Sequence, residues 1–274
     1  MRELRWVEGT DYVLDARFAE GSTPAAPALA DALVAGAPDL LLTPAEGAGR
    51  LLFQRTKTVP IVFGFAVDPV GSGFAASLRK PGGNVIGLSS MATELWPERV
   101  QLFNEAFPTV KHLGMVFSPA IENSVSQAKA IGAAAASLGL RVTPLELKEG
   151  ADIAAAFPRV ASLGAQAYVV AFDAITYGQR REIADHLVRL KAPAMFASAQ
   201  YAESGGLMSY AASITDNFRR AAEYADKILK GTPPGELAIE QPTRFELVLN
   251  LQTAKAIGAT IPKSFLVRVD RLVE

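Results

Sequence analysis

The chain has 274 residues, a formal net charge of −1 and a composition that is 50% hydrophobic. This length suits one large or two medium domains, and the composition supports a packed core and disfavours disorder. The chain has no basic excess with which to neutralise phosphates, so nucleic-acid binding is disfavoured, and the absence of cysteine excludes disulfides, thiolate metal sites and cysteine nucleophiles.

Strand-like and helix-like segments alternate from the N-terminus onward. The alternating pattern of 12–18 and the apolar runs of 39–43 and 59–67 predict strands, and 24–37 and 47–55 predict helices. Continuous apolar runs such as 59–67 are typical of a parallel sheet that is covered on both faces.

The same alternation continues through the middle of the chain. The expected strands are 112–117, 140–147, 167–172 and 193–197, and the expected helices are 95–107, 123–138, 151–163 and 177–190. Alternation of this kind indicates βαβ units and hence an α/β, doubly wound (Rossmann-like) fold in two similar halves.

The tail departs from this rhythm. A strand at 206–211 precedes a strongly amphipathic helix at 213–230, which Ser213 can cap. A linker rich in proline and glycine follows, and then a strand at 245–251 and a short helix at 254–258.

The stretch 61–90 carries the most specific local pattern. It predicts a strand, the loop DPVGSG, a short helix, the turn PGGN and a second strand. Residues 71–76 fit G-x-G-x-x-A, the dinucleotide-binding pattern, which would make the protein a nucleotide-dependent enzyme. No acidic residue closes the following strand to hold a ribose, so the alternative is a glycine-rich turn that lets the chain pack closely.

Other patterns for catalysis or metal binding are absent from the sequence. It has no G-x-S-x-G elbow, no H-E-x-x-H and no acidic cluster, and its two histidines, His112 and His186, are expected to face solvent. We therefore expect no metal and no cofactor. The N-terminal MRELRWVEGTDYV lacks the apolar core of a signal peptide, and no apolar run approaches the ~18–20 residues that span a bilayer.

Small polar residues follow the predicted strands. Ligands of open α/β sheets bind at the carboxyl ends of strands, where helix N-termini attract anions, so these residues predict a polar cleft between the two halves. The alternative is that each residue only caps a helix. The residues concerned are Thr43, Asp68, Ser89, Ser118, Asn123, Ser124, Asp173 and Ser198.

Several segments resemble a known family. They are VPIVFGFAVDPVGSGFAASLRKPGGNVIGLSS, GGLMSYAAS and PTRFELVLNLQTAKAIG, with WVEGTDYVLDARFAEG and VDRLVE towards the two ends. Through them nearly the whole chain resembles the substrate-binding proteins of ABC importers, in the branch of tryptophan-binding-like proteins. The resemblance implies a two-lobed fold of periplasmic-binding-protein type I, a small-molecule solute, an ABC permease in the membrane as partner, and no enzymatic activity.

The resemblance also implies how the chain divides. Lobe 1 is expected to comprise 1–90 and 206–235, and lobe 2 to comprise 91–205 and 243–274, with 236–242 as a crossing linker. The two lobes would close around the ligand by hinge bending.

The family's ligand contacts can be carried over by position. The implied ligand is an amino acid, aromatic or branched. Asp173 or Asp68 would pair with its ammonium group, and the helix start at Asn123 and Ser124 would bind its carboxylate. The further implied contacts are Thr43, Ala45 in the turn that follows it, and Ser89, with Tyr177, Tyr201 or Phe65 facing an apolar side chain. Ser118 and Ser198 are expected ligand contacts from their places at strand ends alone.

Two departures from the family pattern stand out. Relatives carry an aromatic-Arg-Glu-aromatic run where this chain has Ser198-Ala199-Gln200-Tyr201, which leaves the identity of the ligand open. Relatives also begin with a signal sequence, a first strand and a long helix, whereas this chain begins near the end of that helix, so lobe 1 is expected to lack its first strand. The unpaired strand edges would then need another segment or a second copy, as in a homodimer.

The sequence leaves more than one interpretation of the protein's location and function. The family is periplasmic or otherwise extracytoplasmic, whereas a genuine start at Met1 would leave the protein in the cytoplasm. A ligand-sensing regulatory core is a further alternative to the solute-binding protein and the nucleotide enzyme, because repressor cores share the two-lobed fold.

Overall fold

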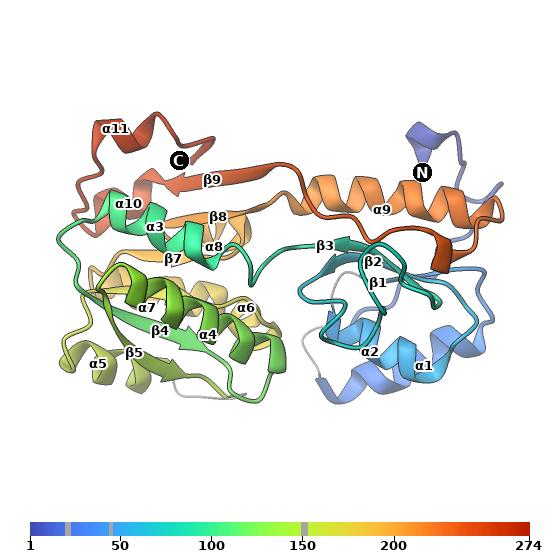
Figure 1. Cartoon of the computed structure of the whole chain (residues 1–274), viewed down its shortest axis with the longest axis horizontal. Coiled ribbons are helices and arrows are strands. Elements are labelled where there is room, and N and C mark those ends of the chain that lie inside the picture. The colour runs from blue at the N-terminus through green and yellow to red at the C-terminus, as the bar shows by residue number, and fades with distance from the viewer. Residues whose placement is uncertain (20–22, 44–45, 149–152) are drawn as a thin grey trace. The chain divides into compact units, whose positions relative to one another are not determined.

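The computed structural model describes residues 1–19, 23–43, 46–148 and 153–274. The chain forms two compact units, of which unit 1 comprises Met1–Met91 and Ser213–Thr243 and unit 2 comprises Ala92–Ala212 and Arg244–Glu274. The chain therefore passes from one unit to the other three times. Each unit is an α/β layer structure with its own sheet and its own buried core (Figure 1).

Unit 1 is built on a small parallel sheet with the order β1-β2-β3. Its strands are β1 (Leu41–Thr43), β2 (Ile61–Ala66) and β3 (Val85–Ser89). Every residue of β2 and β3 is buried, as expected for strands that are covered on both faces.

Helices cover both faces of this sheet. They are α1 (Ala26–Ala35), α2 (Glu46–Arg55) and α9 (Ile214–Leu229). Figure 1 shows α1 and α2 on one side of the sheet and α9 on the other. The strand residues alternate accordingly, since Ile61 and Phe63 pack in the same cluster as residues of α1 and α2, whereas Val62 packs with α9.

The segment 12–18, predicted to be a strand, forms none. Val13 and Phe18 are 87% and 78% exposed, and β1 lies at an edge of its sheet. A strand needs a neighbouring strand to receive its backbone hydrogen bonds, and the described residues of unit 1 place none beside this segment. The alternating pattern of 12–18 is therefore not sufficient for a strand, because no neighbouring strand is there to pair with it.

Unit 2 is built on a larger sheet with the order β10-β9-β8-β7-β6-β4-β5, in which only β8 and β9 pair in antiparallel fashion. Its strands are β4 (His112–Phe117), β5 (Arg141–Glu146), β6 (Ala167–Val170), β7 (Ala194–Phe196), β8 (Met208–Ala212), β9 (Phe245–Asn250) and β10 (Arg271–Val273). The β10 strand at the C-terminus was not predicted, because its three residues are too few for a periodic signal.

Helices again cover both faces. They are α3 (Trp96–Ala106), α4 (Glu122–Ser137), α5 (Ile153–Ser162), α6 (Ala174–Gly178), α7 (Arg180–Arg189), α8 (Ala199–Glu203), α10 (Leu251–Ala256) and α11 (Lys263–Leu266). One core cluster packs α3, α4 and α10 against the sheet, and a second packs α5, α7 and α8. The α/β, doubly wound prediction is thereby confirmed.

The second passage between the units lies further along the chain than the sequence indicated. The sequence predicts residues 206–212 in the first lobe, but β8 pairs with both β7 and β9 and so belongs to the sheet of unit 2. The passage comes at Ser213, whose hydroxyl accepts a hydrogen bond from the backbone of Asp216 and caps α9. The segment 236–242 lies within unit 1, where Glu240 forms a β-bridge with Leu88.

Candidate ligand-binding residues

The centre of the polar residues in unit 2 is Asp173, which follows β6 and is 3% exposed. Its carboxylate caps α6 by accepting hydrogen bonds from the backbone N–H groups of Ile175 and Thr176 at 2.9 and 2.8 Å. The side chain of Thr176 in turn accepts a bond from the Asp173 N–H, which completes a capping box. The cap explains why the predicted helix 177–190 begins earlier, at α6.

Two serines bring a second helix to the same carboxylate. Ser118 follows β4, and Ser124 lies in the first turn of α4. Their hydroxyls donate to Oδ1 and Oδ2 of Asp173 at 3.0 and 2.7 Å, and the Ser118 N–H donates to Ser124 Oγ at 2.9 Å. Three predicted site residues are therefore brought together, and Oδ2 retains the capacity to accept a further bond.

Aromatic rings surround the start of α6. The hydroxyl groups of Tyr201 and Thr176 are 2.9 Å apart, and burial raises the pKa of Tyr201 well above its usual value, so this phenol is neutral. The rings of Phe172 and Tyr177 lie 5.5 Å apart, and the Tyr177 ring lies 5.9 Å from that of Tyr201. The guanidinium of Arg180 covers the Tyr177 ring at 4.6 Å. These rings form an apolar surface beside the polar cluster.

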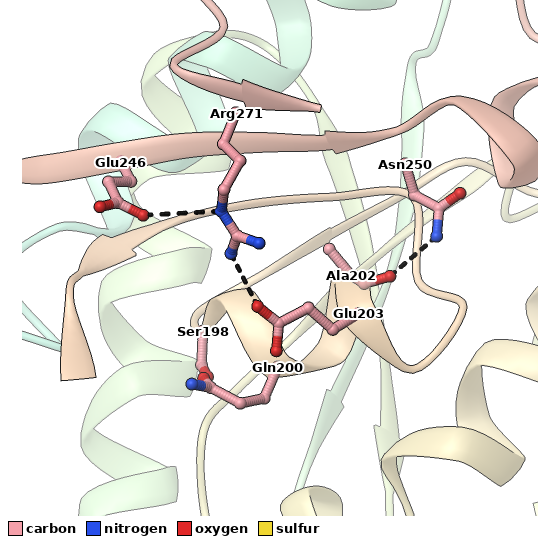
Figure 2. A network of polar contacts seen from close by, with 7 residues as sticks. All are labelled: Ser198, Gln200, Ala202, Glu203, Glu246, Asn250 and Arg271. Atoms are coloured by element: carbon pink, nitrogen blue, oxygen red, sulfur yellow. Dashed lines mark hydrogen bonds and ion pairs between the residues drawn. The ribbon is translucent and has the colours of Figure 1, made fainter. Parts of the chain in front are cut away.

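Helix α8, which carries Tyr201, is tied to the C-terminal strands (Figure 2). Asn250 donates to the Ala202 carbonyl at 2.9 Å, and Arg271 of β10 pairs with Glu203 at 2.8 Å and with Glu246 of β9 at 3.8 Å. At the other end of α8, the buried Ser198 donates to the side chain of Gln200. Ser198 thus starts the helix and is not part of the Asp173 network.

Asn123 lies next to Ser124 but has a different environment. Its Oδ1 atom is buried and has no hydrogen-bond partner among the described residues. Among the described residues, no side chain caps the N-terminus of α4. A buried acceptor without a partner is costly in a stable fold, and it is one feature of a site that completes its bonding with a ligand.

The predicted residues of unit 1 lie at the carboxyl ends of adjacent parallel strands. Thr43 ends β1, Ser89 ends β3, and Asp68 follows β2; Thr43 and Ser89 are buried. Ala45 lies outside the described residues. The strand pairings place Thr43 beside Phe63 and Ser89 beside Ala66, so these positions share one edge of the sheet.

The loop after Asp68 is a turn. Asp68 Oδ1 accepts a hydrogen bond from the Gly71 N–H at 2.8 Å, and a Cβ atom at Gly71 would overlap the Asp68 carboxylate. Residues 71–80 form turns and bends, so the short helix predicted here is wrong. A dinucleotide loop presents its phosphates to the N-terminus of a following helix, and residues 71–76 have no such helix.

Sequence reasoning missed Gln127, which is fully buried on α4. Its Nε2 donates to the Phe172 carbonyl at 2.7 Å and its Oε1 accepts from the Phe172 N–H at 3.0 Å, so the amide continues the end of β6. Trp96 Nε1 also donates to Oε1 of Gln127. Helical spacing could have identified Gln127, because it lies one turn after Ser124 on the face of α4 that packs inward.

His112 was expected to face solvent but is 4% exposed. It lies at the start of β4, with Nε2 2.7 Å from Thr143 Oγ1 and Nδ1 2.8 Å from Arg141 Nη2. Burial, reinforced by the Arg141 charge, lowers its pKa.

The described residues contain no group of three or more His, Cys, Asp or Glu side chains that could hold a metal ion. In the same part of the chain, no helix is long and apolar enough to cross a bilayer.

Comparison with solved structures agrees with this fold. A conserved domain protein from Vibrio cholerae O1 biovar El Tor has a TM-score of 0.91 at 28% identity, over 99% of this chain and 91% of that one. A Streptococcus pneumoniae ABC domain in complex with L-Trp has a TM-score of 0.86 at 27% identity, over 96% and 90% of the two chains. The periplasmic-binding-protein type I fold expected from the sequence is thereby confirmed.

Sequence comparison gives the family. A curated relative, the tyrosine-binding protein of Clostridioides difficile strain R20291, is 22% identical over 257 residues, which are 94% of this chain and 74% of the relative. The sequence family described as ABC transporter substrate binding protein matches residues 3–273. The chain therefore belongs to the family of ABC transporter substrate binding proteins.

Proposed function

We propose that the protein is the solute-binding component of an ABC importer and that its ligand is an amino acid with an aromatic side chain. The observation that carries this proposal is the likeness, at 27% identity over 96% of the chain, to a domain that was solved with L-Trp bound. The named tyrosine-binding relative points to the same class of ligand.

The residues of unit 2 supply groups for each part of such a ligand. The Asp173 carboxylate, with remaining capacity at Oδ2, would accept a bond from the ammonium group. The α4 N-terminus and the unsatisfied Asn123 side chain would receive the carboxylate. Tyr177 and Phe172 would contact the aromatic side chain.

Residues of unit 1 would contribute at the strand ends, through Thr43, Asp68 and Ser89, and Ala45 stays a predicted contact outside the described residues. Binding that engages both units would be accompanied by hinge bending in the three passages between them. In this proposal the ligand-bound protein is recognised by a membrane permease, acts outside the cytoplasm and performs no chemistry. A homodimer has no support in the comparisons and is not part of the proposal.

The proposal is tested by ligand-induced stabilisation. L-Trp, L-Tyr, L-Phe and L-Leu are added to the purified protein and thermal unfolding is followed. A true ligand present at about 100 times its Kd stabilises the folded state by about 2.7 kcal/mol. Tryptamine, which lacks the carboxylate, and indole-3-propionate, which lacks the ammonium group, are the matched controls and should shift the transition far less.

A site variant separates specific binding from general stabilisation. Asn123→Ala should weaken binding of L-Trp, whereas Lys129→Ala, an exposed position on the same helix, should not. No shift with any of the four amino acids at millimolar concentration would contradict an amino-acid ligand. A shift of the unfolding transition with NAD or ATP would favour the alternative function, a nucleotide-dependent enzyme.

A further inference from the structure

Arg99 of α3 is a buried cation that forms no ion pair with a carboxylate in the described part of the chain. It is 1% exposed and belongs to none of the ion pairs there. Burial lowers its pKa to about 9, which still leaves it charged at neutral pH. The Glu94 charge acts on Arg99 but forms no ion pair with it. Burying a charge without a direct ion pair is costly, so this arginine lowers the stability of the fold unless other contacts offset the cost.

The guanidinium binds two backbone carbonyls. Nη1 donates to the Ala92 carbonyl at 2.6 Å, and Nε donates to the Tyr210 carbonyl at 2.7 Å. Its Cζ atom lies 4.9 Å from the centre of the Trp96 ring, which fixes the plane of the fork. Two segments far apart in the sequence are thus held by one rigid group.

Both carbonyls lie next to a passage between the units. Ala92 is the first residue of unit 2 after the first passage, and Tyr210 lies two residues before Ala212, the last residue of unit 2 before the second passage. The third passage is joined to the second, because Ala212 pairs with Phe245 in the β8–β9 ladder. Arg99 therefore connects, directly or through one ladder, the unit 2 ends of all three passages.

The unit 1 ends of the first and third passages are tied as well. The Ser89 N–H donates to the Glu240 carbonyl at 2.9 Å, and the Glu240 N–H donates to the Gly87 carbonyl at 3.2 Å. Ser90 is anchored to unit 1 as well, since its N–H donates to the Ala66 carbonyl at 2.7 Å. In the first passage only Met91 therefore lies between the anchored ends, and it has a left-handed backbone with φ of 51°. That conformation is uncommon for a residue with a side chain and marks a point of strain.

We propose that Arg99 is a positioning residue of the hinge, which fixes the unit 2 ends of the passages so that bending is confined to the few residues between the anchors. This inference rests on the proposed function, in which ligand binding is coupled to hinge bending. Arg99 does not contact the ligand in this proposal. It acts by narrowing the range of arrangements that the ligand-free protein samples, which lowers the entropic cost of binding.

The absence of cysteine from the chain makes the test direct, since introduced cysteines are the only labelling sites. Arg79→Cys in unit 1 and Lys129→Cys in unit 2 are exposed positions for spin labels, and pulsed EPR gives the distribution of distances between them without ligand. A second pair within unit 2, Lys129→Cys and Arg189→Cys, reports on the integrity of unit 2 itself.

Arg99→Met should broaden the distribution between the units and leave the distribution within unit 2 unchanged. Arg99→Lys, which keeps the charge but lacks the planar guanidinium group, should also broaden the distribution between the units. An unchanged inter-unit width in folded variants overturns the proposal, and so does equal broadening of both label pairs. If neither variant folds, Arg99 serves the folding of unit 2 and the proposal is wrong.

These measurements use no ligand, so they decide the role of Arg99 even if no amino acid binds. Where the parent protein binds L-Trp, the Kd of Arg99→Met should rise several-fold, because a smaller fraction of molecules is in the binding-competent arrangement. An unchanged Kd together with a broadened distribution would overturn the coupling of the hinge to binding and leave the amino-acid ligand itself intact.

Discussion

The hydroxyl of Ser124 donates a hydrogen bond of 2.7 Å to Asp173, which lies 49 residues further along the chain. The bond joins the first turn of α4 to the end of β6, and Ser118 adds the end of β4 to the same carboxylate. Asp173 thus holds together the loops in which the candidate ligand contacts of unit 2 are placed.

Asp173→Ala is expected to lower the free energy of unfolding by about 3 kcal/mol, because it removes a helix cap and leaves two buried serine hydroxyls without their acceptor. Chemical denaturation followed by circular dichroism measures this loss. Asp185→Ala, at an exposed position on α7, is the control and should change stability by less than about 0.5 kcal/mol. Equal losses in the two variants would show that the network contributes nothing.

Tyr201→Phe is expected to cost about 1 kcal/mol, since it removes only a hydroxyl that is bonded to Thr176 in a fully buried site. The ring remains to pack against Phe196, with the two centroids 5.0 Å apart. Tyr210→Phe is the matched control, because none of the hydrogen bonds among the described residues uses the Tyr210 hydroxyl. A Tyr201→Phe protein as stable as the control would show that this hydrogen bond does not contribute to stability.

The strands and helices were predictable wherever a segment carries its own periodic signal. The strand prediction 112–117 coincides with β4, and the helix prediction 213–230 differs from α9 by one residue at each end. The family and the fold type followed from segments such as DPVGSGFAASLRKPGGN. The residues that follow strands, Ser118 and Asp173, and the helix start at Ser124 were recognisable as one polar edge, because carboxyl ends of parallel strands meet.

Features that depend on a distant partner were not predictable. The segment 12–18 has the pattern of a strand but no neighbour, and the strand 206–211 had its pattern recognised but its sheet misassigned. His112 sits beside Arg141 and Thr143 only because β4 and β5 pair in register. Whether a polar residue caps a helix or contacts a ligand is likewise set by its neighbours in space, and Asp173 already serves as a cap.

Acidification is expected to destabilise unit 2 through His112. Arginine can only donate, so the bond from Arg141 requires Nδ1 of His112 to be an acceptor and the ring to be neutral. The pKa of His112 is lowered in the folded protein, so the unfolded chain binds the proton more readily, and stability is lost as pH falls below the unfolded value of about 6.5.

Urea unfolding at about pH 7.5 and about pH 5.5 measures this effect. The loss of stability between the two should be smaller in His112→Gln than in the parent protein. An identical pH dependence in His112→Gln and the parent would exclude His112 as the titrating group.

Gly87→Ala is expected to be strongly destabilising, because this glycine sits where β2 and β3 shift register and the backbones approach closely. Its φ is 148°, and an added Cβ would overlap the Phe63 carbonyl oxygen and lie 2.7 Å from the Phe63 nitrogen. Backbone atoms inside a buried sheet cannot move aside, so we expect a loss of about 3 kcal/mol or failure to fold. Gly83→Ala is the matched control, since a Cβ there meets no atom within 4 Å, and it should stay within about 1 kcal/mol of the parent in the same denaturation experiment. A Gly87→Ala protein as stable as Gly83→Ala would mean that β2 and β3 can separate at this point, and the tie between Gly87 and Glu240 in the hinge would then be looser than the structure indicates.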